Sequence, residues 1–197
     1  LKIFWKPTQS RRNFMSEELL VRHCSPTLAG IKTGNMFTMP YTTEKAVNED
    51  IRRLNKMLVP KGLRALPLRY VRSRVLIYIY RPKNLKKDLS QKEAFSILKC
   101  CGYESCNPDK CIVKLIKKLR CNEEFPHEIG LFLGYPPEDV RGFIENKAEH
   151  YKFTGFGKVY GDENKARKLF AKYKKCTNAY YCSWSQGKSI ERLTVAV

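Results

Sequence analysis

The chain has 197 residues, the length of one domain with at most a small appendage. Its 38 lysines and arginines outnumber its 19 aspartates and glutamates, so the net charge is +19. Such a charge favours an anionic partner: nucleic acid, a membrane surface, an acidic protein or a phosphorylated ligand. The sequence contains no run of about eighteen apolar residues, which predicts no transmembrane helix. Eight cysteines without a secretory signal predict reduced thiols and a cytoplasmic protein.

The first fourteen residues, LKIFWKPTQSRRNF, differ in character from the rest of the chain. They carry four basic side chains, no acidic ones and no helical period. Met15 then reads as a natural start, and Ser16 as the N-cap of a short helix. We interpret residues 1–14 as an upstream extension or a disordered arm, and residues 15–197 as a single domain.

A segment rich in reactive side chains comes after that short helix and runs from His23 to Phe37. It presents a candidate site of His23, Cys24, Lys32 and Asn35 in a loop punctuated by glycines. A histidine near a cysteine can lower the pKa of the thiol and create a nucleophile. Adjacent side chains in an extended chain point apart, which favours an incidental pair. A thiol-dependent enzyme using Cys24 remains an alternative.

A helix is predicted from about Thr43 to Leu58. Its apolar residues Val47, Ile51 and Leu54 recur at helical spacing and continue to Leu58.

Two strands are predicted next, over Leu63–Val71 and Val75–Tyr80. The second is rich in β-branched and aromatic residues, which is typical of a central strand. Residues 72–74 are the expected hairpin turn, and Pro82 ends the second strand.

Basic and aromatic residues alternate on this hairpin. The candidate anion-binding residues are Arg69, Arg72, Arg74 and Arg81. Tyr78 and Tyr80 share one face of the strand and Ile77 the other. Such a surface can stack bases and contact phosphates, as in proteins that bind single-stranded nucleic acid. The pattern favours the other interpretation, in which the tyrosines pack against helices.

Two helices are predicted in the centre of the chain. Ser90 and Glu93 form a capping-box pattern for a helix ending near Cys100, and Asn107 and Pro108 open the next. Five cysteines cluster here, at positions 100, 101, 106, 111 and 121. Their spacings lack paired zinc knuckles, which favours structural cysteines and predicts no metal site. No cofactor is expected.

The stretch FPHEIGLFLGYPPEDVRGFIENK, residues 125–147, matches a helix-turn-helix pattern. Gly130 stands where the two helices must approach closely, and Gly134 where the turn needs a positive φ. A DNA reader needs basic or amide side chains on its second helix, whereas this helix opens with Glu138 and Asp139. The pattern favours a compact helical corner with a core of Ile129, Phe132, Leu133, Val140, Phe143 and Ile144.

The C-terminal third predicts a strand over Tyr151–Tyr160, a long helix capped by Asp162, and a last strand over Ile190–Val197. Helices and strands are partly segregated along the chain. The sequence therefore predicts an α+β fold, with a mixed or antiparallel sheet of about four strands, helices covering one face, and a helix-turn-helix-like corner.

Several of these stretches together resemble one bacterial family. They are CSPTLAGIKTGNMF, YTTEKAVNEDIRRLN, RVLIYIYRP, FPHEIGLFLGYPPEDVRGFI, YKFTGFGKVYGDENKARKLFAKYKKC and GKSIERL. The family is a domain of unknown function, numbered 3793, found mainly in anaerobic bacteria. The resemblance covers about residues 15–197 and implies no activity or catalytic residue. Family genes lie near those of flavodoxins and iron handling, which implies a redox or metal context.

These observations predict a cytoplasmic basic domain that binds an anionic partner. The partner is an acidic redox protein such as a flavodoxin, or a phosphorylated ligand. The alternatives are a nucleic-acid-binding module and a thiol-dependent enzyme using Cys24.

Overall fold

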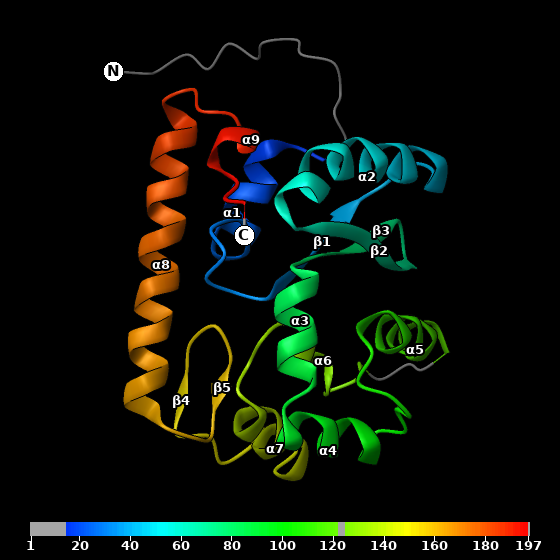
Figure 1. Ribbon diagram of the computed structural model, residues 1–197, viewed down its shortest axis with the longest axis vertical. Coiled ribbons are helices and arrows are strands. Elements are labelled where there is room, and N and C mark those ends of the chain that lie inside the picture. The colour runs from blue at the N-terminus through cyan, green and yellow to red at the C-terminus, as the bar shows by residue number, and fades with distance from the viewer. Residues whose placement is uncertain (1–14, 122–124, 197) are drawn as a thin grey trace.

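The computed structural model describes residues 15–121 and 125–196 (Figure 1). It confirms the predicted α+β class. In chain order the elements are α1 (Glu17–Leu28), β1 (Gly34–Pro40), α2 (Glu44–Leu58), the short 3-10 helix η1 (Val59–Lys61), β2 (Arg64–Val71), β3 (Arg74–Tyr80), α3 (Pro82–Leu89), α4 (Lys92–Cys100), α5 (Pro108–Cys121), α6 (Ile129–Phe132), α7 (Pro137–Glu145), β4 (Phe153–Thr154), β5 (Lys158–Val159), α8 (Glu163–Ser185) and α9 (Ile190–Leu193).

The main sheet has three strands in the order β1-β3-β2, and β3 is antiparallel to both neighbours. Phe37 of β1 lies opposite Ile77 of β3. The predicted hairpin turn between β2 and β3 is present. Arg72 and Ser73 have φ values of 46° and 61°, the left-handed backbone that matches the twist of a tight hairpin.

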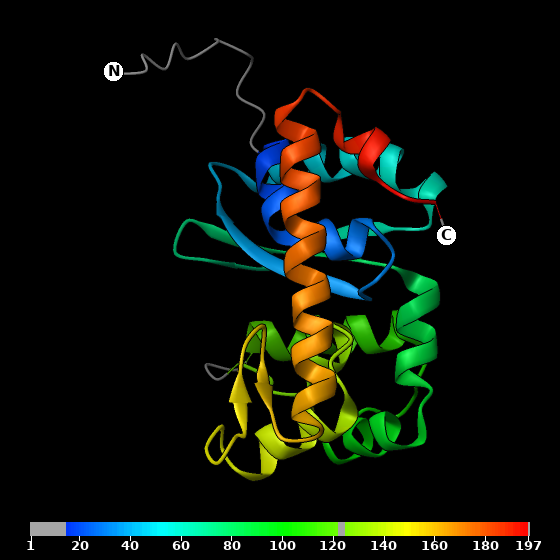
Figure 2. The ribbon, with the colours of Figure 1, turned by 90° about the vertical axis from the view of Figure 1, so that its left-hand side faces the viewer.

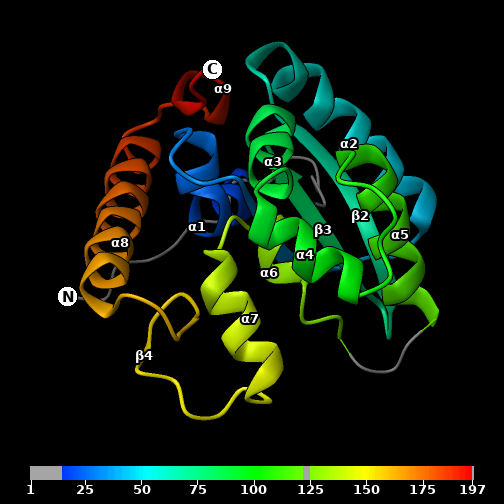
Figure 3. The ribbon, with the colours of Figure 1, turned by 60° about the horizontal axis from the view of Figure 1, so that its bottom comes forward.

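The expectation that helices cover one face of the sheet is wrong, because both faces are covered. Ile77 and Ile79 of β3 belong to a core shared with α1 and α2. Tyr78 and Tyr80 point the other way, into a core shared with α3, α4, α5, α6 and α7. A strand buried on both faces has a nearly continuous apolar sequence, as residues 75–80 do. Figure 1 shows α2 and α3 on opposite sides of the sheet, and Figure 3 shows α3, α4 and α5 near β2 and β3.

The predicted strand over Tyr151–Tyr160 is instead a small hairpin of two-residue strands, β4 and β5. Its turn contains Gly155 and Gly157, and a Cβ atom added at Gly155 would lie 2.4 Å from Phe170. Helix α8 comes next and runs along both helical layers, packing against α1 (Figure 2).

Two predicted boundaries are wrong. Helix α1 continues through His23 and Cys24 to Leu28, because Val21, Cys24 and Leu28 form a buried stripe that keeps the segment helical despite Pro26. Ser90 does not open a helix: it ends α3, and α4 begins at Lys92.

The predicted last strand is also wrong. Ser189 caps the four-residue helix α9, and its Oγ accepts a hydrogen bond from the backbone nitrogen of Arg192 at 3.4 Å. The chain beyond α9 pairs with no strand of the described residues. It is held instead by hydrogen bonds from the Val195 nitrogen to the Leu28 oxygen at 3.0 Å, from Arg81 to the Val195 oxygen at 2.8 Å and from Lys61 to the Thr194 oxygen at 3.1 Å.

Candidate functional site

The outer face of α8 carries a row of lysines. The helix begins at a cap, because Asp162 Oδ1 accepts a hydrogen bond from the Lys165 nitrogen at 2.9 Å. Ala166, Phe170 and Tyr173, spaced at helical intervals, are its buried residues. On the side away from them the helix exposes Lys165, Lys168, Lys172 and Lys175. This α8 lysine row spans roughly 15 Å of helix. Helix α8 itself lies on the side of the molecule facing the viewer in Figure 2.

The α8 lysine row has no acidic partner within the described part of the chain. The ion pairs there involve other cations, among them Arg167, which pairs with Glu163 at 2.6 Å. Like charges three or four residues apart on a helix repel one another. An anion bound along the row would relieve that repulsion.

A second basic surface lies at the turn between β2 and β3. Arg72 and Arg74 are exposed there, and Arg69 is half-buried on β2. Nη2 of Arg74 donates to the backbone oxygen and the hydroxyl of Thr38, both at 3.0 Å. We call Arg69, Arg72 and Arg74 the hairpin arginines. Figure 1 shows their turn on the opposite side of the molecule from α8.

Arg81 is not part of the second surface, although the sequence pattern groups it with the hairpin arginines. It lies at the far end of β3 with 1% of its surface exposed. Its guanidinium donates to the backbone oxygens of Thr27, Leu28 and Val195 at 2.8 Å and of Lys61 at 3.2 Å. These hydrogen bonds tie together the end of α1, the end of η1 and the C-terminal segment.

Three of the candidate loop residues, His23, Cys24 and Asn35, lie in different environments. His23 is exposed on α1 and its ring stacks on Phe37, with centroids 5.4 Å apart. Cys24 is completely buried, and burial raises the pKa of its thiol to about 12. A thiol with that pKa is protonated near neutral pH, so it is a poor nucleophile. Asn35 Oδ1 accepts a hydrogen bond from the Thr27 hydroxyl at 2.8 Å, which is a structural role.

Lys32 has an unusual environment, because 4% of its surface is exposed. Its ammonium donates to the Gly34 oxygen at 2.7 Å and lies 5.1 Å from the centroid of the Tyr135 ring. Burial lowers its pKa to about 8, and the neighbouring Cys24 thiol opposes that shift. Next to it, the Thr33 hydroxyl bonds to Asp88. The loop between α1 and β1 thus contacts both α3 and the turn after α6.

The helical corner has part of the packing that its sequence predicts: Ile129, Phe132 and Val140 are buried, whereas Leu133, Phe143 and Ile144 are half-buried. A Cβ atom added at Gly130 would lie 2.8 Å from Val140, and Gly134 has a φ of 77°. The second helix is not free to enter a DNA groove, however. Asp139 is buried and accepts hydrogen bonds from the backbone nitrogens of Tyr160 and Gly161, at 2.8 and 2.9 Å. The chain after β5 therefore covers this part of the helix.

The base-stacking interpretation of the hairpin is not supported by the geometry. Tyr78 and Tyr80 stack on each other, with centroids 4.6 Å apart, and both are buried. The Tyr78 hydroxyl donates to the Phe132 oxygen. Neither ring is accessible to a base.

The cysteines do not form a recognisable metal centre in the part of the chain that the structure describes. No group of three or more histidine, cysteine, aspartate or glutamate side chains there could hold a metal ion. All eight cysteines are free thiols. Within residues 15–121 and 125–196, no helix combines the length and apolar character needed to cross a membrane.

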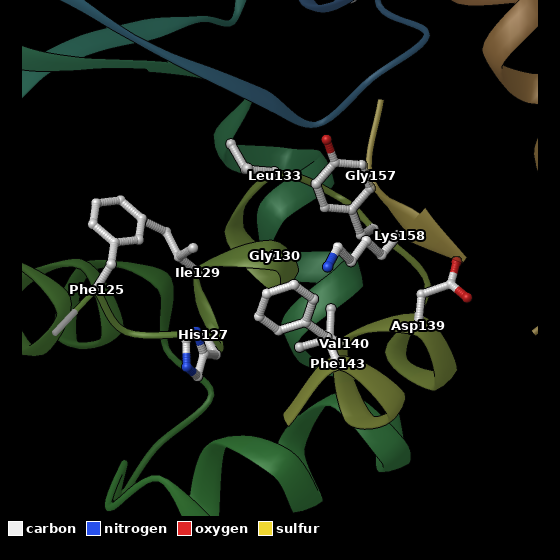
Figure 4. Close-up of a pocket in the computed structure, with 11 residues that line it drawn as sticks. Phe125, His127, Ile129, Gly130, Leu133, Asp139, Val140, Phe143, Gly157 and Lys158 are labelled. Carbon is white, nitrogen blue, oxygen red and sulfur yellow. The ribbon is translucent and has the colours of Figure 1, made fainter. Parts of the chain in front are cut away.

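A pocket of about 180 Å³ lies between the helical corner and the β4–β5 hairpin (Figure 4). Its apolar walls come from Ile129, Leu133, Val140 and Phe143, and Lys158 lies at its hairpin side. The remaining lining residues are Phe125, His127, Gly130, Tyr135, Asp139 and Gly157. Sequence reasoning missed this pocket because no local pattern shows that the β4–β5 hairpin folds back against the helical corner. It also missed the α8 lysine row, although the lysine spacing opposite the apolar stripe is a readable signal.

These features define a small α+β protein with a basic outer helix and a basic hairpin turn. The chain belongs to the DUF3793 family, described as a protein of unknown function, whose model matches residues 20–194. This match confirms the resemblance found in the sequence. No curated protein and no solved structure matches the chain.

Proposed function

We propose that this protein binds an acidic partner protein along the α8 lysine row. One observation carries the proposal: four exposed lysines lie on one helix face, without a carboxylate partner among the described residues. Complementary charge speeds the encounter of two proteins and sets their orientation. An acidic redox protein such as a flavodoxin is the first partner to test, since the family's gene context implies one. A phosphorylated ligand would use the same ammonium groups.

The hairpin arginines are the rival surface for the same partner. Arg72 and Arg74 are exposed, but Arg74 already bonds to Thr38. The α8 lysine row has four exposed ammonium groups, and none of them forms an ion pair with a carboxylate of the described chain. These differences favour the row.

Single-stranded nucleic acid is the second candidate partner, and a groove beside α8 favours it. Phe156 at the tip of the β4–β5 hairpin is 47% exposed and lies next to Arg167 and Lys174 across the groove. Exposed aromatic rings beside basic side chains suit stacked bases and phosphates. A nucleic acid would use this groove together with the α8 lysine row.

The experiment measures binding of the full chain to a flavodoxin and to a random single-stranded oligonucleotide across a salt series. One variant changes Lys165, Lys168, Lys172 and Lys175 to glutamine. The control variant makes the same change at four exposed lysines of α3 and α4, namely Lys83, Lys86, Lys87 and Lys92. A third variant reverses Arg69, Arg72 and Arg74 to glutamate.

We expect the flavodoxin to bind in a salt-sensitive manner, and the α8 variant to bind about tenfold more weakly or worse while the control stays near the wild type. Equal losses in both lysine variants would show that net charge alone matters and would contradict the α8 site. A larger loss on reversing the hairpin arginines would move the site there. Tight oligonucleotide binding without flavodoxin binding, linear on a log–log salt plot, would replace the proposal with the second candidate.

A further inference from the structure

The pocket at the helical corner has the size of a small-molecule site. A cavity of about 150 Å³ can hold a benzene ring, and this one measures about 180 Å³. Ile129, Val140 and Phe143 give it apolar walls, and Gly130 has no side chain to fill it. Protein sites for small ligands commonly combine apolar walls with a few polar groups that fix the orientation of the ligand.

The charged group that the pocket offers is the ammonium of Lys158. It lies 5.9 Å from the centroid of Phe143 and 4.6 Å from that of Tyr151, so two aromatic rings are near it. Among the described residues it donates one hydrogen bond, to the Ala148 oxygen, and it forms no ion pair with a carboxylate. An ammonium group has three hydrogens, so two remain for a ligand. Figure 4 shows this nitrogen directed toward Phe143, across the pocket.

The acidic residue that lines the pocket does not neutralise the charge of Lys158. Asp139 already accepts hydrogen bonds from the backbone nitrogens of Tyr160 and Gly161, at 2.8 and 2.9 Å. In Figure 4 its carboxylate points away from Lys158 and from the apolar walls. The pocket therefore joins an apolar interior to one cation that lacks an anionic partner.

The loop that holds Lys158 in place is itself strained. Lys147, Ala148 and His150 have positive φ values of 47°, 66° and 57°, which residues other than glycine rarely adopt. The Ala148 oxygen is the acceptor for the Lys158 ammonium. Strain of this kind persists where the surrounding structure imposes it, and it concentrates at binding sites.

We propose that this pocket binds a small carboxylic acid whose body is an aromatic ring or a branched alkyl group. The ring or alkyl group packs between Ile129, Val140 and Phe143, and the carboxylate accepts hydrogen bonds from Lys158. A charge-assisted bond of this type is stronger than one to a neutral amide oxygen. The pocket therefore selects acids over their amides and over amines. This proposal is independent of the α8 lysine row.

The test titrates the full chain with phenylacetate, with its neutral counterpart phenylacetamide, and with phenethylamine, each monitored by NMR of the backbone amides. Benzoate and isovalerate are the other acids of the panel. We expect at least one acid to bind saturably with a dissociation constant at or below about 1 mM. The shifts should centre on Ile129, Val140 and Gly157. The amide should bind about tenfold more weakly or worse, and the amine should not bind.

Variants of Lys158 complete the test. Lys158→Met should lose about tenfold or more of the affinity for the acid, whereas Lys158→Arg should keep most of it. Lys152→Met is the control. Lys152 is an exposed lysine six residues before Lys158, and its ammonium donates a hydrogen bond to the Gly161 oxygen. If Lys158→Met does not fold, the comparison of acid and amide binding to the wild type still tests the proposal. No saturable binding of any acid, equal binding of acid and amide, or undiminished binding by a folded Lys158→Met would overturn the proposal.

Discussion

The ammonium nitrogen of Lys32 lies 5.1 Å from the centroid of the Tyr135 ring. This contact joins the loop between α1 and β1 to the turn between α6 and α7, two segments a hundred residues apart in sequence. The same loop presses Thr33 against Gly134, where an added Cβ atom would lie 2.9 Å from the threonine Cβ. Burial of a charge at such a junction makes the stability of the fold depend on pH.

Lys32 should contribute stability that increases from pH 8 upward. Its pKa is about 8 in the folded protein and 10.5 in an unfolded chain. Between these values the unfolded chain binds more protons, so the contribution of Lys32 to the unfolding free energy rises with pH. Below pH 8 both states are charged, and the cost of burying the ammonium is fully present.

Urea unfolding of the wild type and of Lys32→Met at pH 7.5 and pH 10 measures this contribution. We expect the unfolding free energy of the wild type, relative to that of Lys32→Met, to be higher at pH 10 than at pH 7.5 by on the order of 2 kcal/mol. The raised pKa of Cys24 acts in the opposite direction and is present in both proteins, so the difference removes most of its effect. A difference that stays constant with pH would contradict the buried position of Lys32.

Arg81→Lys should destabilise the protein strongly even though the charge is kept. A lysine cannot donate at once to the oxygens of Thr27, Leu28, Lys61 and Val195, as the guanidinium does. Hydrogen bonds from charged groups contribute about 1.5–3 kcal/mol each, so we expect a loss of at least about 2 kcal/mol. Hydrogen exchange should also show faster opening of residues 193–196. Arg74→Lys, at an exposed arginine bonded to Thr38, is the control and should cost much less.

Gly142→Ala should destabilise the protein although alanine favours a helix more than glycine. An exposed helical site would gain about 1 kcal/mol from this change. At position 142 the new Cβ atom would lie 2.4 Å from Tyr160, so α7 or the chain after β5 must move. We expect a net loss of about 1–3 kcal/mol in thermal or urea unfolding. A gain in stability would mean that the chain after β5 does not cover α7 in solution.

Phe132→Ala and Leu133→Ala should lower the unfolding free energy by different amounts, although the two residues are adjacent. Phe132 is fully buried and packs near Tyr103, so its truncation should cost about 3–5 kcal/mol. Leu133 is half-buried at the edge of the same core and lines the pocket, so we expect about 1 kcal/mol. The sequence pattern ranks Leu133 with the core residues. Similar losses for the two variants would support that ranking over the structure.

Features that depend on neighbouring residues can be read from the sequence. Ser16 and Asp162 cap their helices as predicted, and Gly134 makes the turn that the helix-turn-helix pattern requires. Each of these depends on residues within one or two turns of chain, where capping, periodicity and positive φ are local rules. The family was also readable from the sequence, because its motifs are spread along nearly the whole chain.

Which charges are buried and which surfaces meet becomes evident only in the folded chain. The sequence pattern groups Arg81 with the hairpin arginines. In the structure, however, Arg81 lies at the other end of β3 from the hairpin turn, and its guanidinium lies among carbonyl groups of three distant segments. Lys158 and Phe143 come together across a loop, and Lys32 meets Tyr135 across roughly half of the chain. Desolvation and long-range packing depend on the three-dimensional arrangement of these segments, and no local pattern of residues encodes that arrangement.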